Sequence, residues 1–143
     1  MPGPQFLTPK PAQSPNSKKR FTVQEANRAL SLVRRVAADI VRTHEEITVL
    51  QNQLEQANSD KQDALQDKLQ KQLEILQDYV DELTDIGCDI KDFRLGLIDF
   101  IGHHAGRDIC LCWKHGEETI GYWHELNTGF SGRQPISLLN EKD

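Results

Sequence analysis

The sequence has little of what most functional signatures require. Positive charge is short, because 17 Lys and Arg stand against 22 Asp and Glu and give a formal net charge of -5. Neutralisation of phosphates by Lys and Arg supplies most non-specific affinity for DNA and RNA, so this balance disfavours a nucleic-acid partner. Only 37% of the 143 residues are hydrophobic, which is typical of one soluble domain with a thin core.

Long apolar runs are also missing. None approaches the roughly 20 residues needed to cross a bilayer, and the start of the chain has no apolar segment of the signal-peptide kind. The three cysteines are an odd number and do not make the even disulfide framework of a small secreted fold. We therefore expect free thiols, a cytoplasmic protein and no membrane partner.

Local catalytic signatures are absent as well. The sequence contains no phosphate loop of the GxxxxGK type, no GxGxxG dinucleotide fingerprint, no HExxH and no GxSxG. The enzyme classes that carry such signatures are disfavoured, and the sequence favours a protein that is not an enzyme.

The chain divides into a tail and one domain. Residues 1–20 hold five of the six prolines and few apolar residues, which predicts a disordered tail before a single domain at 21–140. Thr22 and Glu25 have the spacing of a capping box at the start of a helix.

A helical hairpin is predicted over residues 22–87. An apolar seam with alternating spacings of three and four continues to about residue 57, pauses at 58–60, and resumes until Gly87. A three-residue connection forces the two helices to lie antiparallel, as in a coiled coil. The first helix carries the seam residues Val23, Ala26, Leu30, Val33, Ala37, Ile40, His44, Ile47, Gln51 and Leu54. His44 is interpreted as a polar register residue facing Glu74 or Gln77.

A small sheet is predicted in the C-terminal part, residues 90–136. Three stretches at 95–101, 108–113 and 119–126 are rich in aromatic and β-branched residues and are separated by short glycine-containing turns. The expected fold is therefore α+β, a hairpin followed by a three-stranded antiparallel meander. Alternation places Ile109, Leu111 and Trp113 on one face and Cys110 and Cys112 on the other, so both faces are largely apolar. One face packs on the hairpin, and the other predicts a homodimer.

The order and spacing of four stretches resemble a known prokaryotic family, the domain of unknown function number 2203. These stretches are FTVQEANRAL, LGLIDF, LCWKHGE and YWHELNTGFSGRQPI, and the resemblance covers residues 21–136. It implies a small bacterial cytosolic protein and assigns no catalytic residue.

A zinc or iron site is one hypothesis for the sheet. Thiolate and imidazole suit these metals, and the candidate ligands are Cys110, Cys112 and His124. His124 shares the cysteine face if Cys112 pairs with Ile120, whereas a shift of one residue places it on the opposite face. The alternative is that the thiols are simply buried and that no cofactor is bound.

The polar segment around residues 121–136 is a second candidate site. Its glycines and Arg133 suit a small anion, which would contact His124, Glu125, Arg133, Arg107 and Trp123. The alternative is structural: Glu125 pairs with Arg133 or Arg107, and the two tryptophans anchor the core.

A third hypothesis is an acid/base enzyme, which requires that Asp99, Asp108, His124 and Glu125 converge. The function most compatible with all these features is a non-enzymatic oligomeric scaffold or protein-interaction module. The alternatives are a metal- or small-anion-binding sensor on the C-terminal sheet and, further, the enzyme.

Overall fold

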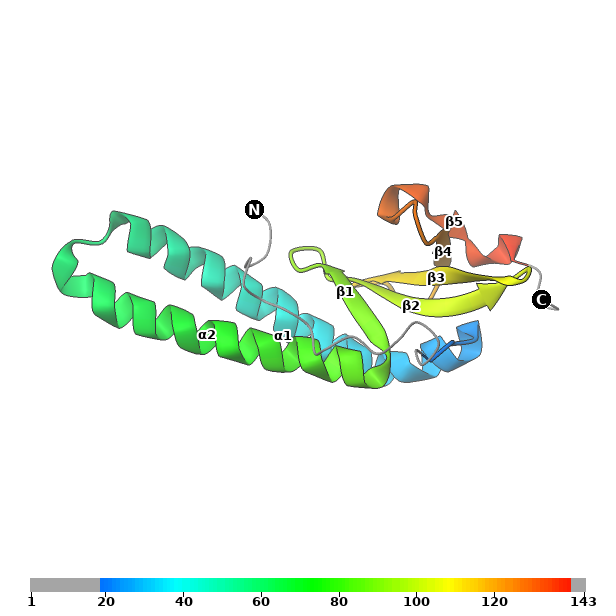
Figure 1. Ribbon diagram of the computed structural model, residues 1–143, viewed down its shortest axis with the longest axis horizontal. Helices are drawn as coiled ribbons and strands as arrows, with labels where there is room; N and C mark the ends of the chain where they lie inside the picture. Colours follow the sequence, from blue (N-terminus) through cyan, green and yellow to red (C-terminus); the bar gives the residue numbers. More distant parts are fainter. Residues whose placement is uncertain (1–18, 140–143) are drawn as a thin grey trace.

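The computed structural model describes residues 19–139, which form two long helices followed by an antiparallel sheet (Figure 1). Of the predicted disordered tail, residues 1–18 lie outside the described residues. The expected α+β architecture is confirmed. The helices are α1 (Val23–Gln56) and α2 (Ser59–Ile86), and the strands are β1 (Cys88–Asp92), β2 (Leu97–His104), β3 (Arg107–Lys114), β4 (Tyr122–Glu125) and β5 (Gln134–Pro135).

Both helix boundaries follow from local chemistry. The Thr22 hydroxyl accepts a hydrogen bond from the Glu25 backbone N–H at 3.0 Å, and the Glu25 carboxylate accepts one from the Thr22 N–H at 2.9 Å, which confirms the capping box. The connection is shorter than predicted, because Ser59 already begins α2. Gly87 ends α2 in the left-handed conformation, with φ of 111°, as glycine does at this position.

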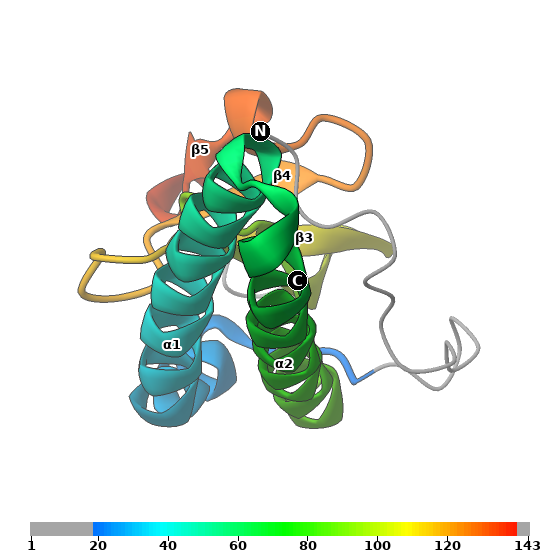
Figure 2. The same ribbon diagram turned by 90° about the vertical axis from the view of Figure 1, so that its left-hand side faces the viewer.

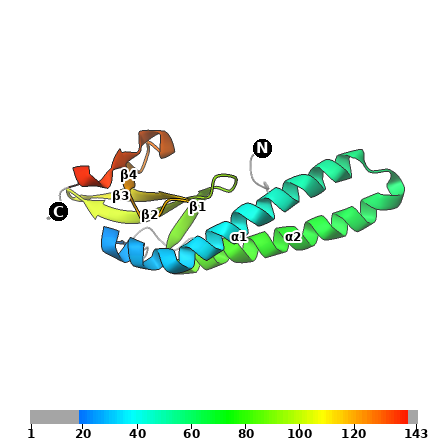
Figure 3. The same ribbon diagram turned by 180° about the vertical axis from the view of Figure 1, so that it is seen from behind.

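The two helices lie side by side, and their far ends extend well beyond the sheet (Figures 2 and 3). Most of the predicted seam is buried near the sheet, where Val36 and Thr43 are buried in addition. His44 is buried, and it has a ring partner that the sequence did not predict. Its ring stacks on Phe93, with centroids 5.8 Å apart, because the turn after β1 reaches this part of α1.

The sheet has five strands in the order β1-β2-β3-β4-β5, all antiparallel to their neighbours. The meander β2-β3-β4 is the predicted one. β1 and β5 were missed, because β1 alternates only two apolar residues with acids and a lysine, and β5 has two residues. The predicted strand 119–126 is shorter because Ile120 donates its backbone N–H to the Asn27 side chain on α1, at 2.7 Å, instead of pairing with β3.

The inner face of the sheet packs on the base of the hairpin. Ile98, Phe100, Leu111, Trp113 and Trp123 form one core cluster with buried residues of α1 and α2. Phe21, two residues before α1, is anchored to the sheet as well, because it donates its N–H to the Ile101 carbonyl at 2.7 Å. The sheet and the half of the hairpin that lies nearer to it, the proximal half, therefore share a single core.

The outer face of the sheet points away from the helices and is partly covered by the chain itself. The segment after β4, orange to red in Figure 1, lies on this side of the sheet. Leu126, Gly129 and Phe130 from that segment border the same hollow as Cys110 and Cys112. Part of the cover that the sequence predicted from a second subunit is thus supplied by this monomer.

Candidate functional site

Four polar or sulfur-bearing side chains meet on the outer face: Asp99 of β2, Cys110 and Cys112 of β3, and His124 of β4. The strand register brings them together, because Asp99 lies opposite Cys112 and His124 lies opposite Cys110. None is more than 5% exposed. All four line one hollow of about 310 Å³. We call these four residues the outer-face cluster.

The hydrogen bonds of His124 indicate where its ring carries hydrogen. Nδ1 lies 2.7 Å from the Glu125 carbonyl oxygen, and a carbonyl can only accept, so Nδ1 carries a hydrogen. Nε2 lies 3.1 Å from both carboxyl oxygens of Asp99. A bare lone pair facing a carboxylate would be repulsive, so the pair holds one further proton between the imidazole and the carboxyl group.

This cluster has the ligand atoms of a metal site. Asp99, Cys112 and His124 each offer one ligand atom, and these atoms all lie within 4.8 Å of one another. Two of the three ligands predicted from the sequence, Cys112 and His124, are therefore together. Asp99 completes the group in place of Cys110, which lines the same hollow.

Asp99 was missed as a metal ligand, although the sequence carried a signal for it. It is an acid within the apolar stretch LGLIDF, and alternation along β2 places it on the face of the cysteines. His124 does share the cysteine face, although through a different pairing from the one considered in the sequence analysis. Cys112 pairs with Tyr122 instead of Ile120, and a shift of two residues leaves His124 on the cysteine face.

The thiols of the cluster are neutral at ordinary pH. Burial, followed by the nearby charge of Asp99, raises the pKa of Cys110 and of Cys112 to about 12. Cys88 behaves in the same way on the other side of the sheet, where burial raises its pKa to about 12. All three cysteines are free and buried, as predicted.

Arg133 pairs with a carboxylate of the protein itself. Its guanidinium donates to both carboxylate oxygens of Glu117, at 2.7 and 2.9 Å, and stacks between the rings of Tyr122 and Phe130. The Glu117 pairing differs from the predicted structural alternative, in which Glu125 was the partner. Arg133 instead fastens the segment after β4 to the turn after β3.

The predicted anion-binding set is split between the two faces of the sheet. Glu125 follows His124 directly, so its side chain points to the opposite face, where Arg107 donates to it at 2.6 and 2.9 Å. This Arg107 pair is the structural alternative predicted for Glu125, and it lowers the pKa of Glu125. Trp123 also points to the inner face and belongs to the core. The five residues of the anion hypothesis therefore do not converge on one site.

The four residues of the acid/base hypothesis do not all converge either. Of its four residues, only Asp99 and His124 meet. Asp108 instead accepts hydrogen bonds from Arg20, at 2.8 and 3.1 Å, and this guanidinium lowers the pKa of Asp108.

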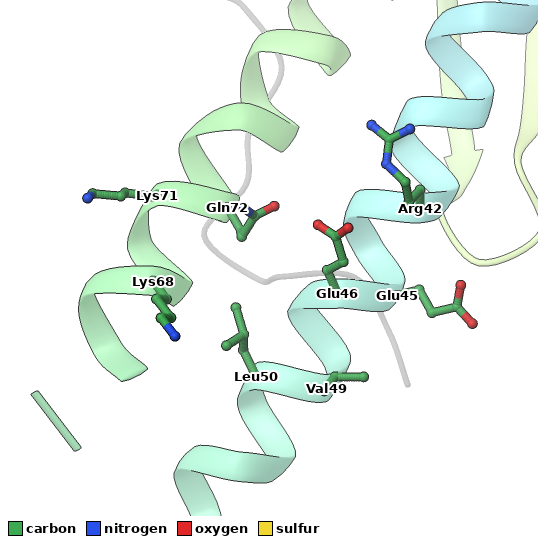
Figure 4. A pocket seen from close by; sticks show the side chains of 8 residues that line it. All are labelled: Arg42, Glu45, Glu46, Val49, Leu50, Lys68, Lys71 and Gln72. Carbon is green, nitrogen blue, oxygen red and sulfur yellow. The ribbon is translucent and has the colours of Figure 1, made fainter. Parts of the chain in front are cut away.

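A second candidate surface lies on the hairpin, where a groove of about 580 Å³ runs along the distal half (Figure 4). Leu50 points into the space between the helices, and Val49 lies beside it on α1 (Figure 4). α1 contributes two carboxylates to the groove, together with the Arg42 guanidinium, which pairs with Asp39 on the same helix at 3.0 Å. α2 contributes two ammonium groups. The lining residues are Arg42, Glu45, Glu46, Val49, Leu50, Lys68, Lys71 and Gln72.

Neither α1 nor α2 has the apolar length that a membrane crossing needs, and this holds for the whole part of the chain that the structure describes.

Comparison with known proteins identifies a family. No curated protein and no solved structure matches the chain. The model of the uncharacterized conserved protein DUF2203 matches residues 19–136, which include both helices and all five strands. The stretches that carried the resemblance in the sequence lie within this range, and the chain belongs to the DUF2203 family.

Proposed function

We propose that the protein is a non-enzymatic interaction module that assembles through its helical hairpin, and that a second copy of the same chain occupies the distal groove. The observation that carries this proposal is the burial pattern. The last buried residue of α1 is Ile47 and the first of α2 is Leu73, so no residue from 48 to 72 is buried.

The unburied stretch is nevertheless apolar along its seam. Leu50, Leu54, Leu65 and Leu69 all lie there half-exposed, and Val49 is 51% exposed. Complete burial of such a side chain contributes about 1.5–3 kcal/mol, and most helical stability in proteins comes from packing of this kind. When the two helices of a second chain pack on the groove, they bury these side chains, as the sheet buries those of the other half of the hairpin.

The charges of the groove favour a second copy as the occupant. Glu45 and Glu46 lie on the α1 side, and Lys68 and Lys71 lie on the α2 side at the same level. A two-fold axis parallel to the hairpin places α1 of one copy over α2 of the other. The acidic side of each copy then faces the basic side of its partner, which is the self-complementarity that a symmetric dimer needs.

Sedimentation or light scattering over a range of protein concentrations tests this assembly. We expect a dimer for the natural chain and a monomer with unchanged helical circular dichroism for Val49→Glu. Leu32→Glu is the matched control, because Leu32 is an equally exposed apolar residue of α1 at 43% but does not line the groove. A natural chain that stays monomeric at all concentrations refutes the proposal.

Charge exchange tests the arrangement of the two copies. Glu46→Lys alone and Lys68→Glu alone each place like charges across the interface, and we expect the dimer dissociation constant to rise by about tenfold. The double variant restores opposite charges and is expected to recover most of the affinity. Failure of this recovery, with a dimer still present in the natural chain, excludes the proposed pairing of α1 with α2.

A further inference from the structure

We infer that Asp99, Cys112 and His124 bind one divalent transition-metal ion, with zinc as the best match to their chemistry. This capacity goes beyond the assembly of the hairpin and uses the opposite end of the molecule. The three residues come from β2, β3 and β4, three adjacent strands of one sheet. Asp99 and Cys112 are paired with a neighbouring strand on both sides, and His124 is paired with Cys110 on β3, so the backbone holds all three as in a preorganised site.

The donor set selects the metal. One carboxylate oxygen, one sulfur and one imidazole nitrogen form the mixed set that zinc and iron accept, whereas magnesium and calcium require oxygen ligands. Three protein ligands also leave one position of a tetrahedron open. Cys110 lines the same hollow and can supply the fourth ligand. If it does not, a solvent molecule takes that position.

The spacing needs only a small adjustment. Zinc bonds of about 2.0–2.3 Å place the ligand atoms of a tetrahedral site roughly 3.3–3.8 Å apart. Nε2 of His124 and the carboxyl oxygens of Asp99 are already 3.1 Å apart. The widest separation within the group is at most 4.8 Å, so the ligand atoms must approach one another by at most about 1 Å to reach the upper end of this range.

The surroundings of His124 are those of a metal-bound imidazole. Metal-ligating histidines nearly always donate their other ring N–H to a carbonyl or a carboxylate, which orients the ring and directs the free nitrogen at the metal. Nδ1 of His124 makes this bond to the Glu125 carbonyl at 2.7 Å. Nε2 is the nitrogen that faces Asp99 and the hollow. Metal binding releases to solvent the proton shared by Nε2 and Asp99 and the thiol proton of Cys112.

The hollow provides a way in. It reaches the surface between Lys91 of β1 and the segment after β4, whose Leu126 and Phe130 are 56% and 41% exposed. An ion therefore reaches the cluster without separation of the sheet from the hairpin. The cluster is also far from the groove at the distal end of the hairpin, so metal binding and assembly can be tested independently.

The experiment uses the full chain purified without an affinity tag, freed of metal with a chelator, and titrated with cobalt and with zinc. Cobalt is a spectroscopic probe for zinc sites, and a bound thiolate gives a sulfur-to-cobalt charge-transfer band. We expect one cobalt per chain with this band, displacement by zinc, and a higher melting temperature with zinc than without it. Absence of both the band and the thermal shift overturns the inference.

Matched cysteine variants locate the site. Cys112→Ser removes the sulfur ligand and is expected to abolish the band and to weaken zinc binding by at least about tenfold. Cys88→Ser is the control, because Cys88 is equally buried, lies on the other side of the sheet, and is expected to leave cobalt binding unchanged.

Cys110→Ser decides the fourth position. A loss of band intensity in this variant assigns Cys110 as the fourth ligand, whereas an unchanged band assigns that position to solvent. If Cys112→Ser does not fold, Asp99→Asn serves instead, since the amide preserves the size of the side chain but is a poorer ligand. Unchanged metal affinity in a folded Cys112→Ser or Asp99→Asn variant refutes the site.

Discussion

The imidazole of His124 lies 3.1 Å from both carboxyl oxygens of Asp99, although 25 residues separate the two along the chain. His124 is 3% exposed and Asp99 is 5% exposed. The two residues lie on β4 and β2, which are not neighbours in the sheet. β3 separates them, and its two cysteines lie beneath the contact. Both partners of this pair are buried, whereas the Arg107–Glu125 and Arg20–Asp108 pairs are partly exposed, and the pair gives the outer face its polar centre.

Removal of one partner of this pair is expected to be strongly destabilising without any metal. Asp99→Ala or His124→Ala leaves the other group buried and unpaired, which costs about 3–5 kcal/mol. The double variant Asp99→Leu/His124→Phe replaces both by apolar groups, so its cost should fall well below the sum of the single costs. Urea unfolding at pH 7 in the presence of a chelator measures all three. Additive costs contradict the pairing.

Stability at alkaline pH should depend on Cys88. Burial raises its pKa from 9.0 to about 12 in the folded protein. Between these values the unfolded chain has lost the thiol proton while the folded chain keeps it, so the unfolded state binds fewer protons and stability falls as pH rises. The slope is at most about 1.4 kcal/mol per pH unit for one thiol. Urea unfolding from pH 8 to pH 10.5 should show a shallower decline for Cys88→Ala, and equal slopes contradict the assignment.

Arg133 should tolerate no conservative replacement. The planar guanidinium donates to both Glu117 oxygens and stacks on two rings, at 4.0 Å from Tyr122 and 4.7 Å from Phe130. Lysine can keep a positive charge beside Glu117, but it has no planar group to stack on the two rings, so Arg133→Lys should cost about 1–3 kcal/mol. Hydrogen exchange should become faster in the segment after β4 and stay unchanged in α2. Arg94→Lys, at an exposed position in the turn before β2, is the control.

Thr22 should contribute through its hydroxyl at the start of α1. Thr22→Ala removes the acceptor for the Glu25 N–H and is expected to cost about 1 kcal/mol, whereas Thr22→Ser keeps the cap and should cost little. Thermal unfolding compares the three chains. An alanine variant as stable as the serine variant shows that packing of Phe21, 4% exposed, holds this end of the helix without the cap.

Much of the helical part could be predicted because it depends on short-range patterns. The Thr22–Glu25 spacing, the apolar seam and Gly87 each act within a few residues, and the structure confirms all three. The position of His44 could not be predicted in this way. Its partner Phe93 belongs to a turn that lies far along the chain, and only the packing of the sheet on α1 brings the two rings together.

The candidate site shows the same division. Alternation along a strand placed Cys110 and Cys112 on one face. Whether His124 shares that face depends only on whether the strand register shifts by an even or an odd number of residues. The register that brought Asp99 opposite Cys112 depends on how β2 and β3 pair. Arg133 was also assigned the wrong partner, because the turn after β3 brings Glu117 to it in three dimensions.

By itself, the sequence determined the family, the two antiparallel helices and the alternation that makes one face of each strand apolar, since these follow from spacing along the chain. Only the tertiary structure decided that β1 and β5 extend the sheet, that Asp99 meets His124, and that the distal hairpin keeps its apolar seam half-exposed. Each of these depends on which distant segments lie side by side, and the periodicity of a single segment does not contain that information.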